Sequence, residues 1–141
     1  MWVLYALLAA LSAAIVTILT KAGLKDTDSN LAFAVQSVFI IIVMWTIILV
    51  QGTAGKMAQF ARKEWVLLGT AGIVTSLSSV FTFKALKLGE ASLVTPLERT
   101  SILFAVIFAA IFLKERITWQ VIVGGTLILA GTILIATVKQ K

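Results

Sequence analysis

Long apolar stretches separated by short polar ones dominate the chain. Four stretches contain no charged residue, namely residues 2–20, 31–55, 65–83 and 117–138. A helix needs about 20 apolar residues to cross the roughly 30 Å hydrocarbon core of a bilayer. Lipid offers no partners to free backbone groups, so a stretch that crosses it must be helical. The pattern therefore predicts four membrane-spanning helices.

A fifth span is predicted before the last of these stretches, where the pattern is less regular. Residues 100–113 are uncharged but too short to cross at about 1.5 Å per residue. Extending the helix back to Ala91 gives the length and places Glu98 and Arg99 inside the span. We expect an all-α membrane protein with five transmembrane helices. The single domain, residues 1–141, is predicted to have spans at about residues 2–21, 31–51, 64–84, 91–113 and 117–138.

The composition supports this prediction. Hydrophobic residues make up 60% of the chain and charged residues 13%, against roughly half and about a quarter in soluble domains. Cysteine and histidine are absent, which excludes disulfides, thiolate nucleophiles and the commonest metal ligand. The sequence contains no nucleotide-binding loop, metal cluster or catalytic triad, and we expect neither an enzyme nor a cofactor or metal.

The net charge of +6 is compatible with nucleic-acid binding. However, basic residues also collect at the ends of membrane spans, because their charged heads reach toward water and lipid headgroups. We favour the second explanation and expect the lipid bilayer, not nucleic acid, as a partner. Lys84 and Lys87, at the end of the third predicted span, are interpreted in this way.

The basic residues are divided almost evenly between the two sides of the membrane. Five spans place these on one side: Lys56, Arg62, Lys63, Lys114 and Arg116. They place these on the other: Lys21, Lys25, Lys84, Lys87, Lys139 and Lys141. Orientation normally follows a clear excess of positive charge in the cytoplasmic loops. In this chain, either a few residues or the order of insertion set the orientation. Alternatively, the chain inserts in both orientations and pairs antiparallel with itself.

Glu98 and Arg99 are the main candidates for chemistry. The sequence from Thr95 through Pro96 to Glu98 matches a capping box with proline at the first helical position, which predicts a helix that begins at Pro96. A charge at the centre of a span costs roughly 2.5–3.5 kcal/mol and usually faces a cavity. There Arg99 could bind a carboxylate or phosphate, and Glu98 could carry a coupling proton. Alternatively, Glu98 caps its own helix and Arg99 extends to the headgroups.

Other polar residues are candidates for a transport path. Ser76 and Ser79 belong to a hydroxyl-rich segment, residues 75–82, of the third span. They line a polar path or bond to carbonyl groups one turn back in their own helix. Gln36 is placed to bond across helices. Trp45 lies away from the span ends, where tryptophan usually anchors, and could face a cavity.

Six stretches also follow a known family pattern. They are KAGLK (21–25), DSNLA (28–32), FKALKLGEAS (83–92), TP (95–96), FLKERIT (112–118) and the glycine-rich residues 124–131. On these residues the chain resembles an EamA-type protein. More narrowly, it resembles the half-size, five-span bacterial and archaeal transporters of the drug/metabolite transporter superfamily. The similarity covers nearly the whole chain.

The resemblance implies one EamA unit, equivalent to half of a ten-helix, inverted-repeat transporter. A chain with one half is then expected to pair, as an antiparallel homodimer would. Relatives move small metabolites, amino acids or drugs by alternating access, often outward. Glu98 and Arg99 stand where relatives tend to carry an acidic–basic pair. Gln36 stands where they often carry an arginine, so a binding role of that arginine does not transfer directly.

We therefore expect a secondary-transporter protomer, in the inner membrane of a prokaryote, that exports a small metabolite or drug-like solute. Arg99 is expected to bind or orient the substrate, with Glu98 as its partner or a proton carrier. The expected lining residues are Gln36, Trp45, Ser76 and Ser79. Two alternatives remain open: a non-transporting or heterodimeric membrane subunit, and a flippase for lipid-linked substrates.

Overall fold

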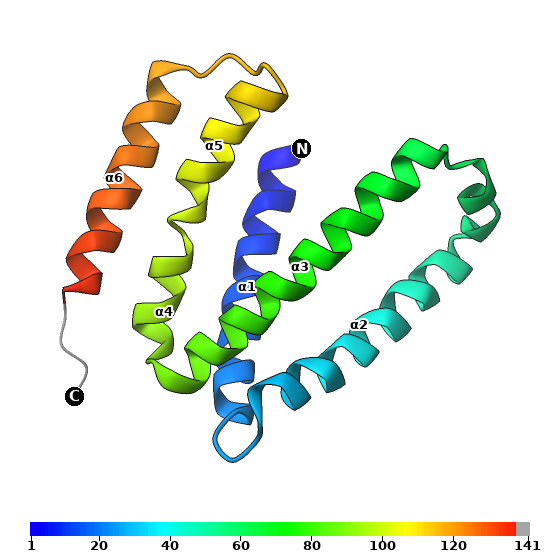
Figure 1. Ribbon diagram of the computed structural model, residues 1–141, viewed down its shortest axis with the longest axis horizontal. Coiled ribbons are helices and arrows are strands. Elements are labelled where there is room, and N and C mark those ends of the chain that lie inside the picture. The colour runs from blue at the N-terminus through cyan, green and yellow to red at the C-terminus, as the bar shows by residue number, and fades with distance from the viewer. Residues whose placement is uncertain (138–141) are drawn as a thin grey trace. The chain divides into compact units, whose positions relative to one another are not determined.

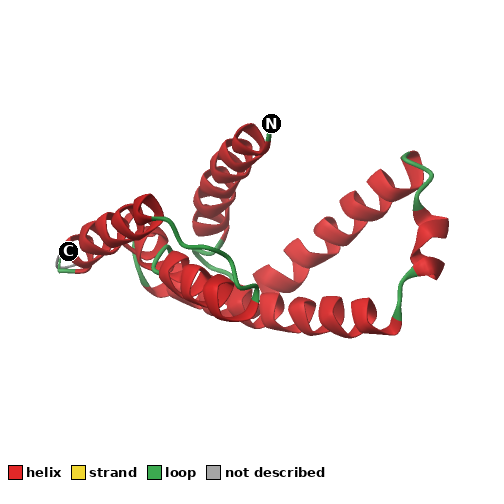
Figure 2. Ribbon diagram, turned by 90° about the horizontal axis from the view of Figure 1, so that it is seen from above, coloured by secondary structure: helices red, strands yellow, loops and turns green. Residues whose placement is uncertain are grey.

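The computed structural model describes residues 1–137, which form helices and loops without a strand (Figures 1 and 2). Val138, in the last predicted span, and Lys139 and Lys141, in the charge comparison, lie outside the described residues. The elements are α1 (Trp2–Gly23), α2 (Ser29–Val50), the short 3₁₀ helix η1 (Ala54–Gln59), α3 (Arg62–Leu88), α4 (Ala91–Glu98), α5 (Ser101–Phe112) and α6 (Trp119–Ala136).

Five helical segments of the described chain are long and apolar enough to cross a membrane. They are α1, α2, α3, the combined segment Ala91–Phe112 that contains α4 and α5, and α6. The predicted fold class, an all-α protein with five transmembrane helices, is confirmed. Most large apolar side chains are exposed, which would be unfavourable in water at about 25 cal/mol per Å². Hydrocarbon removes that penalty, and the chain is a multi-pass membrane protein.

Local hydrogen bonds explain where α2 and α3 begin. The Asp28 carboxylate caps α2 by accepting from the backbone N–H groups of Asn30 and Leu31, at 2.9 and 3.1 Å. The Glu64 carboxylate reaches back to the N–H of Ala61 at 2.9 Å, just before α3. These short polar segments leave the apolar interiors of the helices uninterrupted.

The fourth span begins at Ala91, the start given for the predicted span 91–113, and not at Pro96, where the capping-box pattern placed a helix start. Glu90 takes the extended cap position, and its carbonyl accepts from the N–H groups of Leu93 and Val94, at 3.0 and 2.9 Å. A complete first turn therefore forms ahead of the proline, and Thr95 and Pro96 lie inside α4. The prediction of a helix that begins at Pro96 was wrong, because a backbone cap upstream pre-empts the Thr95 cap.

The fourth span is interrupted at Arg99 and Thr100, between α4 and α5 (Figure 1). The backbone bonds around this point span three residues instead of four. The N–H of Arg99 donates to Pro96 O at 3.0 Å, that of Thr100 to Leu97 O at 3.2 Å, and that of Leu103 to Thr100 O at 3.0 Å. Such tight 3₁₀ turns in a helix often mark a hinge or strain.

The chain divides into two compact units, which we describe separately. The α4–α6 unit contains residues 1–18 and the described residues from 88 onward. In it α4 and α5 follow each other alongside α6 (Figure 1). Gly125 of α6 is buried, and a methyl group added there would lie 3.6 Å from Leu103 Cδ2. The glycine-rich last span therefore packs closely against α5 at Gly125, within the chain.

The α2–α3 unit contains residues 19–87. Its buried apolar residues are Leu24, Phe83 and Leu86. The Phe33 and Phe83 rings contact each other with centroids 5.2 Å apart. Leu24 directly follows α1, Phe33 lies near the start of α2, and Phe83 and Leu86 lie near the end of α3. We call this group of four residues the apolar plug.

Candidate functional site

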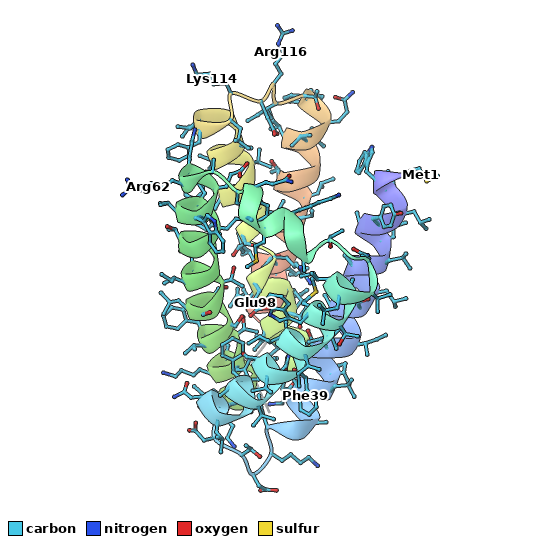
Figure 3. All side chains as sticks on the ribbon, turned by 90° about the vertical axis from the view of Figure 1, so that its right-hand side faces the viewer. Met1, Phe39, Arg62, Glu98, Lys114 and Arg116 are labelled. Atoms are coloured by element: carbon cyan, nitrogen blue, oxygen red, sulfur yellow. The ribbon has the colours of Figure 1, made fainter. Side chains whose placement is uncertain are left out.

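Glu98 and Arg99 lie at the interruption of the fourth span. Glu98 is the last residue of α4, Arg99 its C-cap, and both side chains are exposed. Figure 3 shows Glu98 part-way along the α4–α5 segment, with Lys114 and Arg116 beyond the end of α5. At 1.5 Å per residue, Glu98 is about 20 Å along the chain axis from that end.

Glu98 and Arg99 are not joined as an ion pair. Neither side chain has a hydrogen-bond or ionic partner among residues 1–137. Adjacent residues on a helix point in different directions, and partners on one face are three or four positions apart. An exposed charge at this depth in hydrocarbon costs roughly 2.5–3.5 kcal/mol. Both groups are therefore free to contact water, lipid headgroups, a substrate or another chain.

A hydroxyl on the neighbouring helix holds the start of this interruption. Thr132 of α6 is 4% exposed. Its hydroxyl oxygen lies 2.8 Å from Ile128 O in its own helix and 3.3 Å from Pro96 O. The α6 helix thus contacts the last turn of α4 through a buried polar group. No sequence pattern indicated this contact, since Thr132 lies among apolar and glycine residues without a spacing signal.

Gln36 forms the expected bond across helices. The Thr20 hydroxyl at the end of α1 donates to Gln36 Oε1 in α2 at 3.3 Å, and both residues are half-buried. Ser79 of α3 is also half-buried and lies one turn before Phe83 of the apolar plug. The α2–α3 unit therefore carries polar side chains next to its buried apolar residues.

The remaining two candidates are less enclosed. Ser76 is exposed, and its hydroxyl donates to Gly72 O at 2.9 Å, one turn back in α3. This is the second of the two arrangements that the hydroxyl pattern left open. Trp45 is 45% exposed in α2.

Sequence reasoning missed the role of two lysines. The Lys21 ammonium of α1 donates to Leu86 O of α3 at 2.6 Å. The Lys87 ammonium of α3 donates to three carbonyl oxygens that follow α1, those of Leu24 at 2.6 Å, Lys25 at 3.0 Å and Thr27 at 2.9 Å. We call these four bonds the lysine clasp.

The lysine clasp corrects the interpretation of Lys87 as a side chain that simply extends to water. A signal was present, because the first and third spans run in the same direction and each carries a lysine in its last turn. Lysines in a last turn commonly bond to free carbonyl groups at a helix end. Lys84 is exposed, and its interpretation stays a prediction.

Residues 1–137 match the profile of the EamA-like transporter family. The chain belongs to this family. An uncharacterized transporter encoded in the cobO 3′ region of a Sinorhizobium species is 33% identical over 135 residues, 96% of each chain. An uncharacterized transporter of Archaeoglobus fulgidus is 33% identical over 131 residues, which are 93% of this chain and 45% of that protein. No solved structure is significantly similar to the chain.

The family identified by resemblance is thus confirmed, and this EamA-family member is a transporter rather than an enzyme. The two relatives differ in one informative way. The Sinorhizobium protein has nearly the same length, whereas the chain spans about half of the Archaeoglobus protein.

Proposed function

We propose that the chain is one protomer of a secondary transporter that exports a small metabolite or drug-like solute across a prokaryotic inner membrane. Two copies pair antiparallel and change access from one side to the other. The observation that carries the proposal is the match to 45% of the Archaeoglobus transporter. If a transporter of this kind needs two five-helix units, a chain with one unit obtains the second from another copy.

Charge supports an inverted pair. With five basic residues assigned to one side and six to the other, counting the C-terminus, the usual electrostatic preference for one orientation is nearly absent. Both orientations are then accessible to the same sequence. A pair of opposite orientations would reproduce the inverted halves that the family resemblance implies.

Within this pair, Arg99 binds an anionic group of the solute, a carboxylate or phosphate. Arg99 lies inside the membrane-length segment Ala91–Phe112, at an interruption, and without a partner in the described chain. Substrate sites of many transporters lie at such discontinuous helices near the midplane. Glu98, next to it and equally free, serves as a partner or as the proton carrier.

Gln36 and Ser79 contribute hydrogen bonds along the same path. The resemblance associates the position of Gln36 with an arginine in relatives, so this chain supplies a neutral amide there. Its Oε1 is already bonded to Thr20 at 3.3 Å, which leaves the amide N–H groups as donors. Arg99 is then the charged group that sets the preference for an anionic solute.

The proposal is tested with Arg99→Ala in proteoliposomes. Proteoliposomes that contain the purified protein are loaded with a panel of radiolabelled amino acids and organic anions, and efflux is measured. We expect Arg99→Ala to lose at least about tenfold in transport of the solute that the wild type moves, as loss of a charge-assisted contact predicts. Cross-linking should show an unchanged dimer.

The matched control is Arg62→Ala. Arg62 is an exposed arginine at the start of α3, outside the most apolar segments. The same loss of charge there should leave transport within about twofold. Wild-type transport by Arg99→Ala would refute the assigned role of this residue.

A further inference from the structure

The lysine clasp neutralises two helix ends that would otherwise repel each other. Helices α1 and α3 both end where the clasp lies, and the carbonyl end of a helix carries a partial negative charge. Lys21 of α1 bonds to the end of α3, and Lys87 of α3 bonds to the chain that leaves α1. Each helix therefore supplies the cation for the end of the other.

The geometry uses the full capacity of the Lys87 ammonium. A lysine ammonium has three N–H donors, and Lys87 Nζ has three carbonyl oxygens within 3.0 Å. Hydrogen bonds from a charged donor are roughly twice as strong as neutral ones. The neighbouring Lys84 is exposed and makes no such bond, so the clasp depends on position and not on charge alone.

The clasp lies directly over the apolar plug and beside the polar candidates. Two of the four residues whose carbonyls it holds, Leu24 and Leu86, belong to the plug and are 2% exposed. Lys21 follows Thr20, whose hydroxyl bonds to Gln36. The clasp, the plug and the Thr20–Gln36 bond therefore form three successive contacts inward from one end of the α2–α3 unit.

We propose that Lys21 and Lys87 form a gate at this end of the transport path. While the four ammonium–carbonyl bonds hold, the end of α1 and the end of α3 stay together and the plug excludes solute and water. Opening requires the bonds to break, and water at the membrane surface then solvates the freed ammonium and carbonyl groups. This inference rests on the proposed alternating-access function, and it names Lys21 and Lys87 as positioning residues for that cycle.

A single cysteine at Ser29 reports whether the gate is open. The chain has no cysteine of its own, and Ser29 is 8% exposed, two residues after Thr27, whose carbonyl Lys87 holds. Ser29→Cys is nearly isosteric. The labelling rate with N-ethylmaleimide is measured in nanodiscs, where the reagent reaches both faces, and without any solute.

We expect Lys87→Met to raise the labelling rate of Ser29→Cys about tenfold, because Lys87 makes three of the four clasp bonds. Lys21→Met, which removes the bond to Leu86 O, should also raise it. Lys84→Met is the matched control, since it removes the same charge from the same helix, and should leave the rate within about twofold. Equal rates in Lys87→Met and Lys84→Met would overturn the proposal.

A conservative variant separates gating from loss of fold. Lys87→Arg keeps the charge, but the flat guanidinium cannot direct three donors to the three carbonyls as the ammonium does. We expect a several-fold faster labelling rate with an unchanged helical circular dichroism spectrum. A Lys87→Arg rate equal to that of the wild type would contradict a geometric clasp.

The test does not depend on transport. If Arg99→Ala transported normally while Lys87→Met still raised the labelling rate of Ser29→Cys, the proposed binding role of Arg99 would fail and the gate would stand. If Arg99→Ala abolished transport while no lysine variant changed labelling, the transporter proposal would stand and the gate would fail.

Discussion

At the scale of single residues, several polar side chains satisfy themselves within their own helix, and a few connect different helices. The hydroxyls of Thr46, Ser76 and Thr126 donate to the carbonyl four residues back, at 2.8 to 2.9 Å. Such bonds are inexpensive in lipid and carry no tertiary information. Thr132 and Thr20 differ, because the hydroxyl of each bonds to another helix. Sequence alone does not separate the two groups, since both are hydroxyl residues inside apolar stretches.

Thr132→Val tests the value of one such interhelical bond. Valine keeps the shape of threonine but cannot bond to Pro96 O, so the contact between α4 and α6 should weaken. We expect a loss of about 0.5–1 kcal/mol in the free energy of unfolding, as for interhelical bonds in other membrane proteins. The measurement is unfolding of purified protein by titration with sodium dodecyl sulfate.

Thr126→Val is the control for this variant. Thr126 is exposed on the same helix, and its hydroxyl donates to Ile122 O at 2.8 Å. Its replacement should leave stability nearly unchanged. Equal losses in the two variants would show that the Thr132–Pro96 contact contributes nothing.

At the scale of elements, the uncharged stretches predicted the helices well, because hydrocarbon enforces both length and hydrogen bonding. The start of α4 could not be predicted in the same way. Two local patterns compete within a few residues, the extended Glu90 and the Thr95–Pro96 pair, and the upstream one begins the helix. The interruption at Arg99 and the clasp at Lys87 depend on neighbours distant in the sequence, which a local pattern does not contain.

Pro96→Ala tests the origin of the discontinuous fourth span. Proline in a helix interior removes one backbone donor and clashes with the carbonyl four residues back, at a cost of about 3 kcal/mol. Alanine should restore the donor and make α4 and α5 more continuous. We expect greater stability, by about 1–3 kcal/mol, together with several-fold slower transport, because the segment becomes stiffer.

The two readouts for Pro96→Ala are unfolding by sodium dodecyl sulfate and efflux from proteoliposomes. A less stable protein would mean that the proline fits its site without strain. An unchanged transport rate would mean that the interruption plays no part in the cycle.

At the scale of the whole molecule, the apolar surface and the half-length match are both what the proposed pairing of two copies predicts. None of the residues in the most apolar stretches of α1 and α2 is buried, as expected of helices that meet lipid or another chain. The match to this chain covers 45% of the length of the Archaeoglobus relative. The basic residues are nearly balanced between the two predicted sides, as the proposed insertion of a second copy in the opposite orientation requires.

The most direct test of the inverted pair is cysteine accessibility on intact cells. Single cysteines replace Lys25, which precedes α2, and Lys63, near the start of α3. These positions flank α2 and so lie on opposite sides of the membrane. If chains of both orientations are present, as the account predicts, an impermeant maleimide labels each variant from outside. Labelling of one variant and full protection of the other would establish a single orientation and contradict the antiparallel homodimer.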